Sequence, residues 1–143
     1  MLRLSPIILA VVAYAAPAHA VDSCAATIPP EAAAKAKAFL DLLVANKGAE
    51  AVSGVLDANP IWSAKIGAKE QMIGQIDAAT KAYGKPTKWE AVCGDAVGTM
   101  AFREYYLVQY HDVITRWEFD FARTATGWQI GYFGFNDQIP TWF

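Results

Sequence analysis

The chain has 143 residues and a formal charge of −2, with 12 basic side chains against 14 acidic ones and no basic cluster. This balance is unsuited to binding nucleic acid or an anionic membrane surface, so both partner classes are excluded. The length suffices for one compact domain with its own core.

Residues 1–20 are predicted to be a secretory signal peptide. Arg3 precedes the apolar run IILAVVAYAA, and small residues follow up to Ala20. This pattern predicts cleavage after Ala20. The run is too short for a membrane span, and no later apolar stretch is long enough either. We therefore expect an exported protein, periplasmic or secreted, with a single domain over residues 21–143 and no membrane span.

Cys24 and Cys93 are the two cysteines of the chain. In an oxidising compartment an isolated pair has one intramolecular connectivity, which predicts the disulfide Cys24–Cys93. Closing so long a loop contributes roughly 4 kcal/mol to stability. A redox or metal site would need closely spaced cysteines or several histidines, and His111 is the only histidine after residue 20. No metal or cofactor is expected.

Three helices are predicted in the first half of the chain. The segment TIPPEAAAKAKAFLDLLVANKG, residues 27–48, has a cap residue and prolines at its start and a glycine at its end. Its buried stripe is predicted to be Phe39, Leu40, Leu43 and Val44.

The second and third helices are separated by a linker. AEAVSGVL is predicted as a short helix ending before Pro60, and residues 68–83 as a longer one, with apolar residues at helical spacing. Between them lies NPIWSAKIG, which is predicted to be irregular and to carry Trp62. Trp62 is expected either to cap the mouth of a pocket or to pack the linker onto the core.

From Trp89 the period of the apolar residues changes to two, which predicts four strands. Their sequences are KWEAV, GTMAFREYYLVQY, VITRWEFDFAR and GWQIGYFGFN. Hairpin-sized connections join the last three strands, so they run antiparallel. Helices followed by an antiparallel sheet define the α+β class.

The register of the second and third strands follows from a two-residue turn at His111 and Asp112. This turn pairs Tyr110 with Val113 and brings Arg103 opposite Asp120. One face of the sheet is then largely polar, as a one-sided sheet requires. The other face is aromatic and carries Phe102, Tyr106, Trp117, Phe119 and Phe121.

The fourth strand changes phase partway along. Ile130 falls opposite Phe121 on the aromatic face, but strict alternation would then turn Phe133 outward. A bulge at Gly131 and Tyr132 returns Phe133 to a position opposite Phe119. Burying Phe133 and Phe135 is worth roughly 4 kcal/mol, which outweighs one disturbed ladder position.

The segments KAYGKPTKWEAV, RWEFDFAR and GWQIGYFGFND together resemble the nuclear transport factor 2-like, cystatin-like superfamily. They look most like its small exported bacterial domains of unknown function. The resemblance covers nearly the whole chain after residue 20. It implies three N-terminal helices packed in the curve of a strongly bent, cone-like, four-stranded sheet that encloses an apolar pocket. Members include enzymes and inert binding domains, so this fold does not select a function.

Glu104 is the one catalytic candidate, because the register places its carboxylate on the aromatic face between Phe102 and Tyr106. Burial there raises a carboxyl pKa, and the resemblance implies a general base at that position. No second acid or histidine shares the face, although Tyr106 is able to donate a hydrogen bond to Glu104. The alternative is that a lysine, a glutamine or a helix backbone amide holds Glu104.

The leading functional hypothesis is an exported, non-catalytic domain that binds a small apolar ligand or a protein partner. The alternatives are an isomerase- or dehydratase-like enzyme with Glu104 as base, and an accessory interaction module. The expected ligand-pocket residues are Trp62, Phe102, Glu104, Tyr106, Trp117, Phe119 and Phe133.

The outer face of the sheet is only half polar. Tyr105, Leu107, Ile114 and Tyr132 lie on it, which favours a homodimer formed through this face. The apolar tail IPTWF is expected to dock on the domain or on a second copy. His111 is expected to be an exposed turn residue, and Asn136 with Asp137 either a turn or part of a pocket rim.

Overall fold

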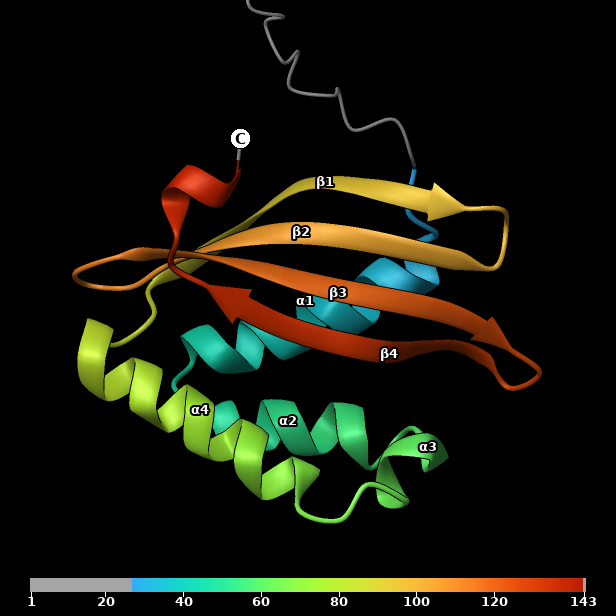
Figure 1. The fold of residues 1–143 in the computed structure, drawn as a ribbon, viewed down its shortest axis with the longest axis horizontal. Coiled ribbons are helices and arrows are strands. Elements are labelled where there is room, and N and C mark those ends of the chain that lie inside the picture. Colours follow the sequence, from blue (N-terminus) through green and yellow to red (C-terminus); the bar gives the residue numbers. More distant parts are fainter. Residues whose placement is uncertain (1–26, 143) are drawn as a thin grey trace, which may run out of the picture.

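The computed structural model describes residues 27–142, and the predicted signal peptide and Cys24 lie outside the described residues. Helices come first and an antiparallel sheet follows, which confirms the α+β class (Figure 1). The elements are α1 Pro30–Val44, α2 Gly48–Leu56, α3 Pro60–Ser63, α4 Ala68–Tyr83, β1 Lys88–Val97, β2 Ala101–Gln109, β3 Ile114–Thr124, β4 Gly127–Asn136 and the 3₁₀ helix η1 Ile139–Trp142.

The described chain has four α-helices, not the three that were predicted. The additional one, α3, is a single turn inside the segment expected to be a linker. It forms because Pro60 presets the first helical residue and the side chain of Asn59 accepts a hydrogen bond from the Ile61 amide at 3.2 Å.

The other three helices lie in the predicted segments, but Pro29, not Thr27, is the N-cap residue of α1. Helix α1 also ends at Val44, which is only half-buried, and Gly48 begins α2 instead of ending α1.

The sheet has the order β1-β2-β3-β4, and the predicted register of its last three strands is confirmed. The Tyr110 amide donates to the Val113 carbonyl at 2.8 Å, and Arg103 lies opposite Asp120. The bulge in β4 is also confirmed. Ile130 pairs with Phe121 and Tyr132 with Asp120, so Gly131 is the extra residue between them.

Strand β1 is longer than predicted. It continues past Cys93 to Val97, and a second register shift, which was not predicted, lies between Ala91 and Cys93. Pairing with β2 supplies hydrogen-bond partners for this half of β1, although most of its residues are exposed.

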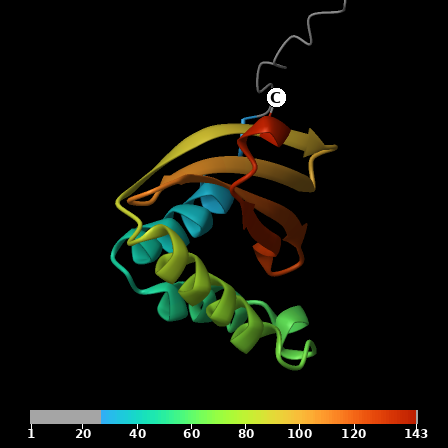
Figure 2. The ribbon, with the colours of Figure 1, turned by 60° about the vertical axis from the view of Figure 1, so that its left-hand side comes forward.

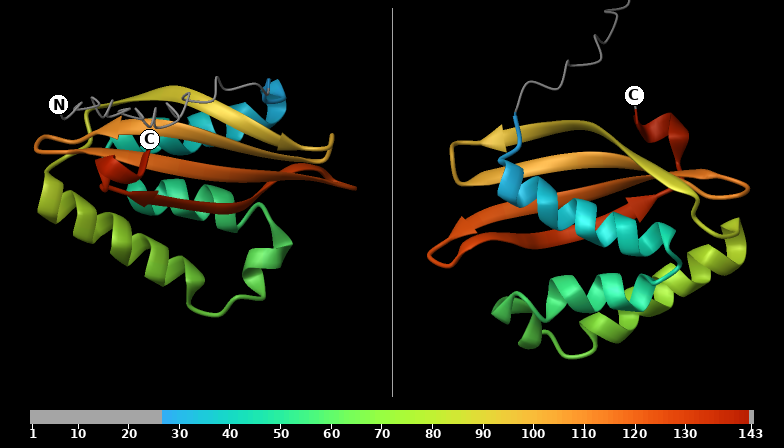
Figure 3. Two further views of the ribbon diagram at one scale, coloured as in Figure 1. Left: turned by 45° about the horizontal axis from the view of Figure 1, so that its top comes forward. Right: turned by 180° about the vertical axis from the view of Figure 1, so that it is seen from behind.

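The helices are not all packed in a curve of the sheet. Helix α1 crosses one face of the sheet, whereas α2 and α4 lie together beyond its β4 edge (Figure 3). The sheet is open and does not curl strongly around the helices (Figure 2). The expected strong bend is therefore not confirmed.

The core forms where α1 meets the aromatic face. The ring of Phe39 lies 5.4 Å from Trp117, 5.4 Å from Phe119 and 5.1 Å from Phe133, measured between centroids. Each such aromatic pair stabilises the fold by about 0.5–1.5 kcal/mol beyond the burial of area. The fully buried Ala32 and Ala36 let α1 approach the sheet closely.

Candidate functional site

Most of the predicted pocket residues lie in the core. Tyr106, Trp117, Phe119 and Phe133 are at most 3% exposed, and Phe39 packs over the last three of them. The aromatic face is thus filled by a side chain of α1 at its centre.

Phe102 lies toward one end of the same face. It is half-buried and packs edge-on against Trp128 at a centroid distance of 5.3 Å. Trp62 reaches the core from α3, with its ring 6.3 Å from that of Phe133. Trp62 also lines an open hollow of about 510 Å³ beside α3, which the Lys69–Asp57 ion pair borders.

Glu104 is half-buried on the aromatic face, and its carboxylate accepts a hydrogen bond from the Tyr106 hydroxyl. Tyr106 is the hydrogen-bond donor that the predicted register places beside Glu104. Burial raises the pKa of the Glu104 carboxyl, and the Tyr106 hydrogen bond opposes that shift. Burial and the neighbouring carboxylate together raise the pKa of Tyr106. The pair is a hydrogen-bonded unit within one strand.

The remaining polar candidates make local structural contacts. His111 is exposed at the β2–β3 turn and contacts Asp112, as expected. Asn136 accepts hydrogen bonds from the Gln138 amide and, at 2.7 Å, from the Trp142 indole. The tail residue Trp142 therefore docks on its own domain.

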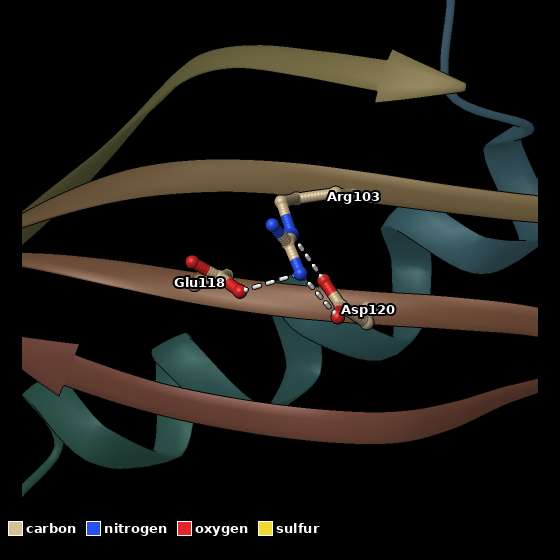
Figure 4. Close-up of polar contacts among 3 residues, drawn as sticks. All are labelled: Arg103, Glu118 and Asp120. Atoms are coloured by element: carbon tan, nitrogen blue, oxygen red, sulfur yellow. Dashed lines mark hydrogen bonds and ion pairs between the residues drawn. The ribbon is translucent and has the colours of Figure 1, made fainter. Parts of the chain in front are cut away.

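The outer face of the sheet carries an ion-pair cluster that links β2 and β3 (Figure 4). The guanidinium of Arg103 donates to both carboxylate oxygens of Asp120, at 2.7 and 2.8 Å, and lies 3.0 Å from Glu118. Burial raises the pKa of the Glu118 carboxyl, while Arg103 opposes that shift. Arg103 thus ties both carboxylates to β2, and the cluster links the two strands.

A different feature has the properties of a binding site. Helices α1 and α2 and strand β4 enclose a partly open hollow of about 150 Å³, which we call the α1–α2 hollow. Its lining is mainly apolar and includes Phe39, Leu42, Val55 and Ile130. Through Phe39 the floor of this hollow is continuous with the aromatic core.

Small residues keep the α1–α2 hollow open. Four of its ten lining residues are alanine or glycine, namely Ala38, Ala51, Gly54 and Ala58. A Cβ added to Gly54 would meet no atom within 4 Å, so packing does not require glycine there. Glycine inside a helix costs about 1 kcal/mol relative to alanine.

The hollow has two polar lining residues, Lys35 on α1 and Gln129 on β4. Lys35 is half-buried. Within residues 27–142 no carboxylate lies within 4.0 Å of its ammonium group. Neither residue was predicted from the sequence to line a site, and the local sequence signal near the hollow is a glycine in the middle of a short helix.

Comparisons of the chain with protein-family models, with curated proteins and with solved structures found no match. Among the described residues, no group of three or more histidine, cysteine, aspartate or glutamate side chains is arranged to hold a metal ion. Over the same residues, no helix is long and apolar enough to cross a membrane. The geometry of the α1–α2 hollow is thus the main guide to function.

Proposed function

We propose that this protein is an exported, non-catalytic binding domain that holds a small apolar molecule in the α1–α2 hollow. The observation that carries the proposal is a mainly apolar, partly open hollow of about 150 Å³, four of whose ten described lining residues are alanine or glycine. An apolar cavity of about this size in another protein binds benzene. The ligand, or the part of it that enters, is therefore expected to be about the size of one aromatic ring.

The glycine at position 54 favours a binding role for the α1–α2 hollow over an accidental gap in the packing. An alanine there would favour the helix by about 1 kcal/mol, and the added methyl group has room. Gly54 is exposed, so a larger side chain there would also have room. Keeping glycine at this position thus costs stability and preserves the open volume.

The test compares two helical glycines in their response to benzene. Gly54→Leu fills the hollow, whereas Gly74→Leu on α4 places the same side chain where a Cβ also meets no atom within 4 Å, outside the hollow. Benzene is titrated while the backbone amide shifts of Ala51 and Val55 are followed by NMR. The wild type and Gly74→Leu should show saturable shifts and Gly54→Leu should not, with its fold intact by circular dichroism. Absence of saturable shifts in the wild type contradicts the proposal.

We further propose that the chain is a member of the nuclear transport factor 2-like, cystatin-like superfamily, with a sheet that is less strongly bent than the cone of that superfamily. The order of helices and strands and the bulged last strand support this assignment.

A homodimer through the outer sheet face also remains a proposal. It is supported by the exposed Ile114 and Tyr132, and light scattering that gives the mass of a single chain would exclude it.

A second candidate function is the isomerase- or dehydratase-like enzyme with Glu104 as general base. Its support is the half-buried position of this carboxyl on the aromatic face, where burial raises its pKa. The α1–α2 hollow does not include Glu104 in its lining, however, and the carboxylate already accepts the Tyr106 hydroxyl. An ordinary pKa for Glu104, measured by carbon-detected NMR titration, would exclude this candidate.

A further inference from the structure

We infer that the ligand of the α1–α2 hollow is a monocarboxylate with an apolar body, whose carboxylate pairs with Lys35. The inference rests on the proposed function, since it specifies the chemistry of a molecule bound in that same hollow. It adds the charge of the ligand and the side chain that selects it.

The first argument is the state of Lys35. A lysine on a helix surface commonly has an acidic neighbour one turn away, and Glu31 occupies that position. In the structure, however, the Lys35 ammonium group and the Glu31 carboxylate are more than 4.0 Å apart, so they form no ion pair. Within the described residues the half-buried Lys35 thus lines an apolar hollow and has no ion-pair partner within 4.0 Å.

The second argument is the number and type of polar groups at the hollow. Among the described residues that line the hollow, Lys35 is the only charged one and Gln129 the only other polar one. One ammonium group matches one negative charge, whereas phosphate recognition usually draws on several donors or an arginine fork. The remaining eight of the ten lining residues are apolar or glycine, so they fit a hydrocarbon body.

The shape of a lysine side chain allows Lys35 to contact both the apolar body and the carboxylate of such a ligand. The methylene stem of a lysine packs along apolar surface while its ammonium group stays near water. A carboxylate at the open side of the hollow would keep part of its hydration and meet this ammonium group, so the charge need not be buried. The apolar body would lie against Phe39 and Val55.

Three ligands with one ring in common separate this inference from the proposed function: benzene, benzamide and benzoate. Benzoate should bind roughly tenfold more tightly than benzamide, its neutral isostere, because a hydrogen bond to a charged group is stronger than one between neutral groups. Raising the salt concentration should reduce this preference. Binding is followed at the amides of Ala51 and Val55.

The variant Lys35→Met keeps an unbranched apolar stem and removes the charge. It should abolish the preference for benzoate over benzamide and leave benzene binding within about twofold of the wild type. The matched control is Lys37→Met on the same helix, because Lys37 faces Trp89 and does not line the hollow. This control should retain the tenfold preference.

Each outcome is decisive. If benzene binds in the hollow but benzoate binds no more tightly than benzamide, the carboxylate inference is overturned and the proposed function survives. If the preference persists in Lys35→Met, Lys35 is not the selecting group and the inference also fails. If none of the three ligands shifts the amides of the hollow, the proposed function itself fails.

Discussion

The indole nitrogen of Trp62 donates a hydrogen bond to the carbonyl oxygen of Ile130 at 3.1 Å. The side-chain amide of Asn59 donates to the same oxygen at 3.0 Å. Within the described residues strand β4 has β3 as its only neighbour in the sheet, so carbonyls on its other edge need other partners. The α2–α3 segment supplies them next to the bulge at Gly131, and Trp62 thereby fixes that segment to the sheet.

The substitution Asn59→Ala should lower the free energy of unfolding by about 1–2 kcal/mol. Asn59 is only 8% exposed, and its side chain both donates to Ile130 and caps α3. Trp62→Phe should cost less, about 0.5–1 kcal/mol, since the ring remains and Asn59 still satisfies the carbonyl. Urea denaturation measures both.

The matched control for Asn59→Ala is Ser63→Ala in the same turn. The Ser63 hydroxyl bonds the Pro60 carbonyl at an exposed position, so its loss should change stability by less than about 0.5 kcal/mol. Equal effects of Asn59→Ala and Ser63→Ala would show that the Ile130 contact does not hold the segment.

Two glycines in the sheet should respond in opposite ways to alanine. A Cβ on Gly94 would lie 2.7 Å from the Arg103 carbonyl oxygen and 2.6 Å from Ile28 Cδ1, so Gly94→Ala should destabilise the fold by about 1–3 kcal/mol. A Cβ on Gly131 would have its nearest neighbour, the Asp120 oxygen, at 3.9 Å. Gly131→Ala should therefore change the unfolding free energy by less than about 0.5 kcal/mol.

Thermal and urea denaturation of the two variants measure this contrast. A large cost for Gly131→Ala would mean that the bulge itself needs glycine. A negligible cost for Gly94→Ala would mean that Ile28 and β2 move apart easily at this point.

The strand register was predictable because it depends on local information. A two-residue turn and strict alternation determine which residues oppose one another, and the aromatic residues then require the bulge in β4. The outer half of β1 lacks that information, since Gly94, Asp95 and Ala96 show no alternation of apolar and polar residues. Only its pairing with β2 makes it a strand.

The sequence contains a local signal for the α3 turn, although this segment was predicted to be an irregular linker. Asn59 followed by Pro60 is a typical helix start. The residues that follow show no helical spacing of apolar residues, so this start signal alone does not predict a helix. The α1–α2 hollow had no such signal. Ala38, Ala51 and Ala58 are ordinary helix formers, and they border open space only because α1 and α2 pack against β4 as they do.

The stability of the protein should fall as pH rises through the titration range of Glu104. Its carboxyl has a pKa raised by burial, so over that range the folded state holds a proton that the unfolded state has released. Glu104→Gln should therefore be more stable than the wild type at about pH 7, and this difference should disappear at about pH 3, where the carboxyl is protonated in both the folded and the unfolded state. Urea midpoints at the two pH values measure the effect.

A control and a second variant test the cause of the Glu104 effect. Glu90→Gln, at an exposed position of β1, should leave the pH dependence unchanged. Tyr106→Phe removes the hydrogen bond that lowers the pKa of Glu104, so this pKa should rise further. If the Glu104 titration does not move in Tyr106→Phe, the hydroxyl is not its partner in solution.

The predicted disulfide between Cys24 and Cys93 is compatible with the path of the chain into α1. Ile28 packs directly on Gly94, the residue after Cys93. Cys24 precedes Ile28 by four residues, and four residues reach at most about 14 Å. Peptide mapping without reductant should therefore yield a linked peptide containing both cysteines.

Reduction of that bond should lower the unfolding free energy by roughly 4 kcal/mol, because it releases a loop of about 70 residues in the unfolded chain. The variant with both cysteines replaced by serine should match the reduced protein and show no response to reductant. If the oxidised and reduced proteins unfold at the same urea concentration, either the bond is absent or its constraint on the unfolded chain is offset by strain in the folded one. The peptide map separates these two cases, and an absence of the linked peptide would refute the pairing.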